Sequence, residues 1–145
     1  MNLIGISINH RTSPIELREA VHLSKDEQKQ FISLLQDNIL REGVVISTCN
    51  RTEIFGIPTS RQVNNNTIFN KLVEFKTAVN LRKEHIEEFD SDNSLYHIAK
   101  VASGIDSLII GDSQILSQCK ESFRLAVNEN FTGTMTKKLF DTAAR

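Results

Sequence analysis

The sequence predicts one α+β domain, with a small β-sheet, packed helices and a helical C-terminal half. A length of 145 residues leaves room for one ordinary domain. An apolar content of 39%, a charged content of 24% and eight Phe are typical of a chain that buries a core. Strand-like runs are concentrated before residue 90 and helical spacing follows, which indicates the α+β class.

The N-terminal third predicts one strand and two helices. The β-branched run 3–8 is typical of a strand, and a short helix over 14–21 follows it. Ser24 and Glu27 form a capping box that starts a second helix. We expect this helix to continue as far as Gly43, because its apolar residues recur at helical spacing: Phe31, Leu34, Leu35 and Ile39.

The middle of the chain predicts two strands and a helix. The β-branched runs 44–47 and 52–57 are expected to be strands, which places residues 48–51 on the connection between them. Residues 58–66 include three consecutive Asn and are expected to form an exposed linker. Apolar residues at helical spacing then predict a helix over 67–80.

The remaining chain predicts a short strand at 86–89 and then helices. Residues 90–92 offer caps for a helix with apolar positions between 95 and 105, and Ser113 is expected to cap the next helix. The segment 134–145 has helical spacing without a stop signal, so we expect the chain to end in mid-helix. The helix after Ser113 should bury one stripe: Ile115, Leu116, Cys119, Phe123 and Ala126.

Charge and hydropathy narrow the possible functions. Seventeen Lys and Arg against eighteen Asp and Glu give a net charge of −1, so the general basic excess of a DNA-coating protein is missing. Any contact with nucleic acid must therefore be local. The N-terminus lacks the features of a signal peptide, and no apolar run is long enough to span a membrane. We expect a cytoplasmic protein.

The two cysteines call for separate explanations. Cys49 and Cys119 are seventy positions apart, with no CxxC and no partnered His spacing, so neither a metal site nor a disulfide framework is expected. Cys119 lies within an apolar stripe and is expected to be core packing. Cys49 follows a strand and precedes Arg51, where a nearby cation would favour the nucleophilic thiolate. The alternative for Cys49 is a small buried hydrophobe.

Three further features could bind a substrate or move a proton. Arg51 presents a planar fork suited to a carboxylate or phosphate, although an ion pair to Glu53 or Glu42 is the alternative. His97 lies off the apolar stripe of its helix, and it either faces solvent or serves as a proton carrier. Residues 111–114 run into a helix start whose amides can bind an anion.

Three ordered blocks together resemble the N-terminal domain of glutamyl-tRNA reductase, the enzyme that begins the five-carbon route to tetrapyrroles. The blocks are residues 5–19, 47–53 and 102–116, and they span most of the chain. The second block reads Ser-Thr-Cys-Asn-Arg-Thr-Glu and is the most specific of the three. It makes the functional interpretations of Cys49 and Arg51 far stronger than position alone does.

The resemblance implies a reaction and a set of site residues. Glutamyl-tRNA would be reduced with NADPH to glutamate-1-semialdehyde through a thioester on Cys49, on the way to 5-aminolevulinate and porphyrins. A thioester carbonyl accepts hydride more readily than an ester, so two feasible steps replace one difficult step. The family's activity-supporting histidine corresponds to His97. Its glutamate-binding positions correspond to Thr48, Asn50, Arg51, Ser107, Asp112, Ser113, Gln114 and Gln118.

The sequence also departs from the family pattern. The family usually has Gly-Glu-Pro-Gln where this chain has Gly111-Asp112-Ser113-Gln114. No Gly-x-Gly-x-x-Gly is present, so residues 1–145 are expected to be the catalytic fragment of a longer enzyme, without its NADPH-binding and dimerisation domains. Alone, the fragment should lack reductase activity, bind no cofactor and need no metal. The implied partners are glutamyl-tRNA, a second subunit in the full-length enzyme and glutamate-1-semialdehyde aminomutase.

Two other functions are compatible with the same residues. A free-standing cysteine hydrolase or acyltransferase acting on aminoacyl esters would keep the nucleophile and dispense with the cofactor. A tRNA-binding or regulatory module without chemistry would make Cys49 structural, and its thiol should then react slowly with iodoacetamide. Lys137, Lys138 and Arg145 form a modest basic end that could contact phosphates, or simply a solvated helix face.

Overall fold

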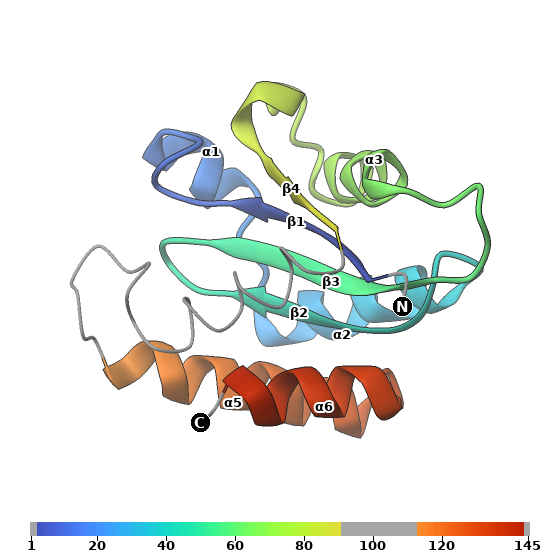
Figure 1. The fold of residues 1–145 in the computed structure, drawn as a ribbon. Coiled ribbons are helices and arrows are strands. Elements are labelled where there is room, and N and C mark those ends of the chain that lie inside the picture. The colour runs from blue at the N-terminus through green and yellow to red at the C-terminus, as the bar shows by residue number, and fades with distance from the viewer. Residues whose placement is uncertain (1–2, 91–112, 144–145) are drawn as a thin grey trace.

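Four antiparallel strands form one sheet in the order β2-β3-β1-β4. The computed structural model describes residues 3–90 and 113–143 (Figure 1). The strands are β1 (Ile4–Ile8), β2 (Leu40–Ser47), β3 (Thr52–Pro58) and β4 (Glu87–Phe89). The helices are α1 (Ile15–Ala20), α2 (Lys25–Gln36), α3 (Asn65–Lys76), the 3-10 turn η1 (Lys83–His85), α5 (Ser113–Asn128) and α6 (Thr134–Ala143).

The register gives the sheet two faces of different character. Ile6 pairs with Ile54, and Ile8 pairs with Thr52, so these side chains share one face. The helices α2 and α3 pack on the strands here and meet each other through Phe31 and Phe75, whose ring centroids are 5.3 Å apart. In Figure 1, α5 and α6 lie together along the β2 side of the sheet. The predicted α+β class is confirmed.

The other face of the sheet carries Ser7, Glu53 and Phe55. Gly5 pairs with Phe55 on this face, and the aromatic ring lies directly over it. A Cβ at Gly5 would come within 2.2 Å of the ring, so only glycine allows this approach. The same ring meets Phe89 of β4 at a centroid distance of 5.9 Å. Apolar packing thus covers one end of this face, and buried polar groups occupy the other.

The helix expected to reach Gly43 ends earlier, so that prediction is wrong. The capping box at Ser24 and Glu27 starts α2 as predicted, but the helix stops at Gln36 and Asn38 adopts a left-handed backbone with φ of 64°. Gly43 lies inside β2 and donates its amide to Phe131 O at 2.7 Å. The error arose because Ile39 fits the helical spacing, yet it is buried as the residue that enters β2.

Two helix starts also differ from expectation by a residue or two. The linker is shorter than predicted, because Asn64 forms a capping box with Thr67 and α3 begins at Asn65. Ser113 is the first residue of α5 rather than its cap. The hairpin of β2 and β3 and the short strand β4 occur where the sequence placed them. Within the described residues, each helix is too short or too polar to cross a bilayer.

Candidate active site at the β2–β3 hairpin

Cys49 lies at the tip of the hairpin that joins β2 to β3. Thr48 donates its amide to Arg51 O at 2.8 Å, which closes the turn, and the amide of Asn50 donates to Thr48 Oγ1 at 3.2 Å. Thr48 is buried, Asn50 is half-buried and Cys49 is exposed. The alternative of a buried, core-packing Cys49 is therefore wrong. A thiol held on a short turn at the rim of the sheet is accessible to a substrate.

The segment that joins α1 to α2 makes polar contacts with the hairpin tip and the end of β2. His22 Nδ1 lies 3.1 Å from Thr48 O, and the amide of Leu23 donates to Ser47 Oγ at 2.9 Å. Arg18 Nη1 lies 3.4 Å from Asn50 Oδ1, at the end of α1. These contacts attach the hairpin to a second part of the backbone, which limits the positions open to Cys49.

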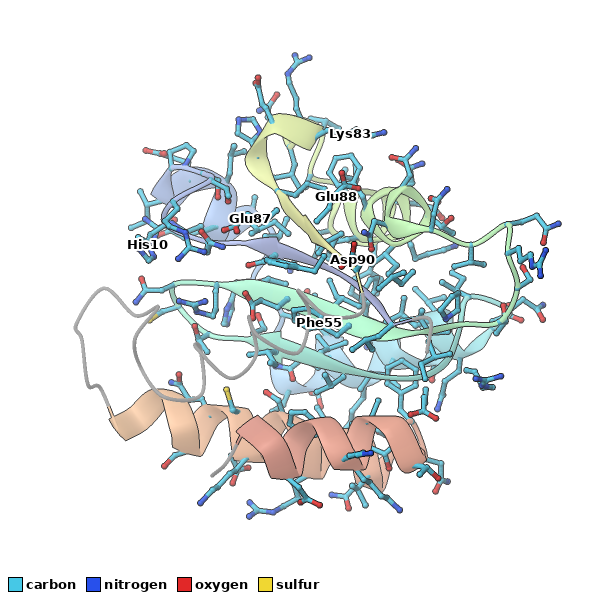
Figure 2. All side chains as sticks on the ribbon, in the orientation of Figure 1. His10, Phe55, Lys83, Glu87, Glu88 and Asp90 are labelled. Carbon is cyan, nitrogen blue, oxygen red and sulfur yellow. The ribbon has the colours of Figure 1, made fainter. Side chains whose placement is uncertain are left out.

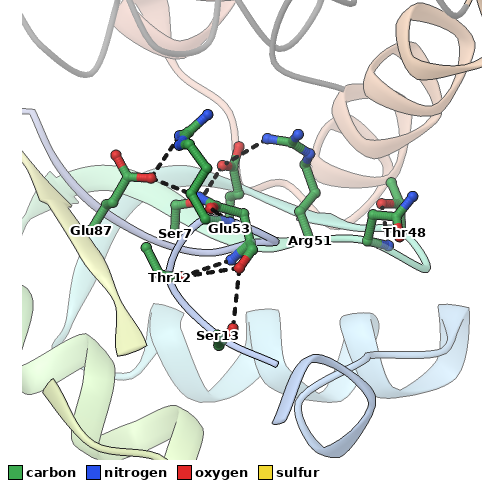
Figure 3. Close-up of polar contacts among 10 residues, drawn as sticks. Ser7, Thr12, Ser13, Thr48, Arg51, Glu53 and Glu87 are labelled. Carbon is green, nitrogen blue, oxygen red and sulfur yellow. Dashed lines mark hydrogen bonds and ion pairs between the residues drawn. The ribbon is translucent and has the colours of Figure 1, made fainter. Parts of the chain in front are cut away.

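Arg51 points into the protein and forms an ion pair with Glu53. Its Nη1 lies 3.5 Å from Glu53 Oε2, and the two residues are 2% and 0% exposed. Ser7 Oγ donates to the same carboxylate oxygen (Figure 3). The pairing with Glu53 proposed as one alternative is therefore present, whereas Glu42 accepts a hydrogen bond from the amide of Thr136 at 2.8 Å. Because Arg51 is buried and paired with Glu53, its guanidinium is held in one place. This guanidinium belongs to the residue two positions after Cys49.

A chain of polar groups continues from Glu53 to the rim of the sheet. Asn9 Nδ2 donates to Ser7 Oγ at 2.8 Å and to Glu87 Oε1 at 2.9 Å. Arg11 Nη2 then contacts Glu87 Oε1 at 2.6 Å (Figure 3). Ser7 and Asn9 are both fully buried. Their hydrogen bonds connect the buried Arg51–Glu53 ion pair to the half-exposed Arg11–Glu87 ion pair. Such a network has few alternative arrangements, since each rearrangement would leave a buried group without its hydrogen bond.

Positive charge gathers around this end of the sheet. Figure 2 shows His10 beyond the end of β1, on the side of Glu87. Burial lowers the pKa of His10 below its ordinary value of 6.5, and the cations Arg11, Arg51 and Arg18 lower it further, against an opposing effect of Glu87. His10 is therefore neutral at pH 7. Arg11, Arg18 and Arg51 thus all lie close enough to His10 to influence its charge, with Glu87 opposing them.

Cys119 has the opposite environment. Its side chain is 2% exposed within α5, in a stripe with the buried Phe123 and Ala126. Burial, and after it the charge of Glu53, raises the pKa of Cys119 to about 12, against a smaller lowering effect of Arg51. The thiol therefore stays protonated at neutral pH. The prediction that Cys119 is a core residue is confirmed.

The structure describes only some of the other predicted site residues. His97, Ser107 and Asp112 lie outside the described residues. Ser113 and Gln114 form the first turn of α5, where the backbone alone is described. Gln118 is exposed on α5 and lines one cleft together with His22 and Ser47, which bind the hairpin tip. The roles assigned to all these residues remain predictions.

The sequence interpretation missed the residues that support Arg51. Glu53 was considered only as an ion-pair alternative for Arg51, and Ser7 and Asn9 only as parts of a motif, although each of the three is fully buried. A usable signal was present: Ser7 and Glu53 are polar residues inside β-branched runs, at positions that should alternate between core and surface. A polar residue on a buried strand needs a partner, so two of them predict a pair.

Neither a metal site nor a dinucleotide site is formed by the residues that the structure describes. Among them, no three His, Cys, Asp or Glu side chains come together as a metal site would require. The sequence contains no glycine-rich dinucleotide fingerprint. No residue of the described part of the chain is therefore assigned to NADPH.

Fold and site together define a small α+β domain that displays a cysteine at a hairpin tip beside a buried arginine. Residues 6–145 match the family model described as "Glutamyl-tRNAGlu reductase, N-terminal domain". The chain belongs to this family.

Individual relatives agree with the family model. The chain is 39% identical over 145 residues to a glutamyl-tRNA reductase of Chlorobium phaeobacteroides (strain BS1), and 39% identical to one of Pelodictyon phaeoclathratiforme (strain DSM 5477 / BU-1). Each match covers 99% of this chain and 34% of the relative, so the chain spans about a third of their length.

A solved structure shows the same fold. Glutamyl-tRNA reductase from Methanopyrus kandleri superposes with a TM-score of 0.76 at 19% identity, covering 98% of this chain and 32% of that one.

Proposed function

We propose that this chain supplies the nucleophile and the glutamate-binding groups for reduction of glutamyl-tRNA to glutamate-1-semialdehyde. Membership of the family supports the reaction class. The observation that carries the assignment to residues is the exposed Cys49 two positions before the buried Arg51. In the full-length enzyme, of which this chain spans about a third, NADPH is proposed as the reductant, with a second subunit and an aminomutase as further partners.

The step that this chain would perform is transfer of the glutamyl group from oxygen to sulfur. The Cys49 thiolate attacks the ester carbonyl, a C–S bond forms, and the C–O bond to the 3′-terminal ribose breaks. The electron pair of that bond leaves with the ribose oxygen, which takes up a proton. His97 is the proposed proton carrier.

Arg51 is proposed to bind the side-chain carboxylate of the glutamyl group. A guanidinium carries five donors in a planar fork, the geometry that binds a carboxylate at two points, and Arg51 lies two positions after Cys49. Burial strengthens such a contact because competing water is excluded. A glutaminyl group would present a neutral amide and lose the charge-assisted bonds, so Arg51 would also distinguish glutamyl-tRNA from glutaminyl-tRNA.

The test is intact-mass spectrometry of the chain after mixing with glutamyl-tRNA in the absence of NADPH. The parent chain should gain a glutamyl adduct that hydroxylamine removes. Cys49→Ser should gain no such adduct, whereas the matched control Cys119→Ala should gain it as the parent does. An adduct that survives on Cys49→Ser, or none on the parent while the tRNA stays charged, would contradict the proposal.

The same experiment separates the alternative functions. A hydrolase would discharge the tRNA continuously, with glutamate released into solution in a Cys49-dependent manner. A non-catalytic tRNA-binding module would bind the tRNA and leave it charged, with no adduct on any variant.

A further inference from the structure

A cleft of about 460 Å³ lies between the start of α2 and one side of α5, at the end of β2 next to the hairpin. Ser47, the last residue of β2, lines it and directly precedes Thr48. His22 lines it as well, and its Nδ1 lies 3.1 Å from Thr48 O. The cleft therefore ends one residue from Thr48 and two from Cys49.

The rim of this cleft is basic, although the chain as a whole carries a net charge of −1. Lys25 and Lys29 come from α2, and Arg124 comes from α5. One carboxylate, Glu121, faces them; it pairs with Arg124 and lies 4.0 Å from Lys25 Nζ. Both partners of the Lys25 contact are mostly exposed, so this ion pair is weak. Three cations against one carboxylate give the cleft an excess of positive charge.

The polar lining fits a sugar-phosphate chain. Asn128 of α5 contributes an amide that can bind a ribose hydroxyl, and the exposed imidazole of His22 can stack on a base. Gln118, already assigned to glutamate binding, lines the same cleft. A basic groove with a stacking platform is the usual arrangement for binding a single strand. A general basic surface is not required, because the contact needs only the few nucleotides nearest the ester.

We propose that this cleft binds the single-stranded 3′ end of the tRNA, with Lys25 and Lys29 contacting its phosphates. The inference rests on the proposed function, since it assigns a path to the tRNA whose ester reaches Cys49. It also explains how a chain with a net charge of −1 can bind a polyanion: the cations are local, as the composition requires.

The second basic region provides a control. Lys137 of α6 lines a different hollow of about 550 Å³ between α5 and α6, which includes Asp141 and has no lining residue from the hairpin. Lys138 is its exposed neighbour. Neutralising Lys137 and Lys138 changes the net charge as much as neutralising Lys25 and Lys29 does. A long-range effect of charge alone would therefore affect both pairs equally.

The test measures binding of uncharged tRNA(Glu) to the chain at several KCl concentrations. For Lys25→Gln/Lys29→Gln, the dissociation constant should rise several-fold at low salt. The slope of log K against log salt should become shallower by about 0.7 for each single-strand phosphate that a lysine no longer neutralises. Lys137→Gln/Lys138→Gln should retain the slope of the parent. All four side chains are exposed, and a thermal melt of each variant checks its fold.

An unchanged slope in Lys25→Gln/Lys29→Gln would overturn the inference, and so would an equal loss of affinity in the control pair. Failure of the proposed function is distinguishable from either. If the parent binds tRNA through Lys25 and Lys29 but never forms the Cys49 adduct, the chemistry is wrong and the binding site stands. If the adduct forms at the parental rate when both lysines are neutralised, the chemistry stands and this cleft does not guide the tRNA.

Discussion

The two cysteines of this chain both lie close to the buried Arg51–Glu53 ion pair, but one is exposed and the other is buried. Cys49 is exposed at a hairpin tip, two positions before Arg51. Cys119 is 2% exposed on α5, and its pKa is raised to about 12 by burial and then by Glu53. The difference shows that the fold exposes one thiol and buries the other, and the exposed thiol is the one proposed as the nucleophile. Residue type alone does not decide which thiol can react.

The local backbone explains this difference. At the hairpin tip the connecting turn leaves Cys49 exposed, although its neighbours Thr48 and Arg51 are buried. A helix stripe that packs on a sheet must bury its residues. The Arg51–Glu53 pair lies between the two regions, so its integrity affects both the position of the hairpin and the environment of Cys119.

The largest effect on stability is expected when one partner of the Arg51–Glu53 ion pair is removed. Glu53→Gln removes the counter-charge that Glu53 supplies to the buried Arg51 guanidinium, and should lower the free energy of unfolding by about 3–5 kcal/mol. Urea denaturation at pH 7 measures the change. The matched control Glu88→Gln removes a carboxylate from the exposed side of the neighbouring strand β4 and should change stability by less than about 0.5 kcal/mol. Equal effects of the two substitutions would show that the buried pair is not a special feature of this sheet.

A smaller effect follows from the raised pKa of Cys119. Between pH 9 and 12 the unfolded chain releases the thiol proton while the folded chain keeps it, since the pKa rises from 9.0 to about 12 on folding. The stability that this thiol contributes is complete below pH 9 and is lost as the pH rises toward 12. The parent should therefore lose up to about 1.4 kcal/mol per pH unit more than Cys119→Ala does.

This prediction is checked by urea denaturation of both proteins from pH 8 to pH 10.5. Other groups that titrate in this range contribute equally to the two proteins and cancel in the difference. Parallel pH dependences for the parent and Cys119→Ala would mean that the thiol is hydrated in the folded state, and the contrast between the two cysteines would then disappear.

Much of this fold could be predicted from local patterns. The capping box at Ser24 and Glu27 and the two β-branched runs around Thr48–Arg51 each depend on a few neighbouring residues, and the structure contains all of them. The end of α2 could not be found in this way. Ile39 satisfies the helical spacing and the requirement for burial in β2 equally well, and only the tertiary fold selects the strand.

The candidate site divides in a similar way. The position of Cys49 on a connection and the core location of Cys119 follow from the runs on either side of them. The chain of contacts from Arg51 through Ser7 and Asn9 does not, because it joins β1, β3 and β4 across the sheet. Those contacts depend on strand order and register, which local spacing does not determine.

The most direct test of the account is site-resolved alkylation of the native chain. The chain is treated with iodoacetamide at pH 8, with and without glutamyl-tRNA, and each cysteine is followed by peptide mass spectrometry. Cys49 should be labelled and Cys119 should remain unlabelled until denaturant is added, while glutamyl-tRNA should protect Cys49 until hydroxylamine restores its reactivity. Labelling of Cys119 as fast as Cys49 in the native chain, or a Cys49 that glutamyl-tRNA leaves fully reactive, would contradict the account.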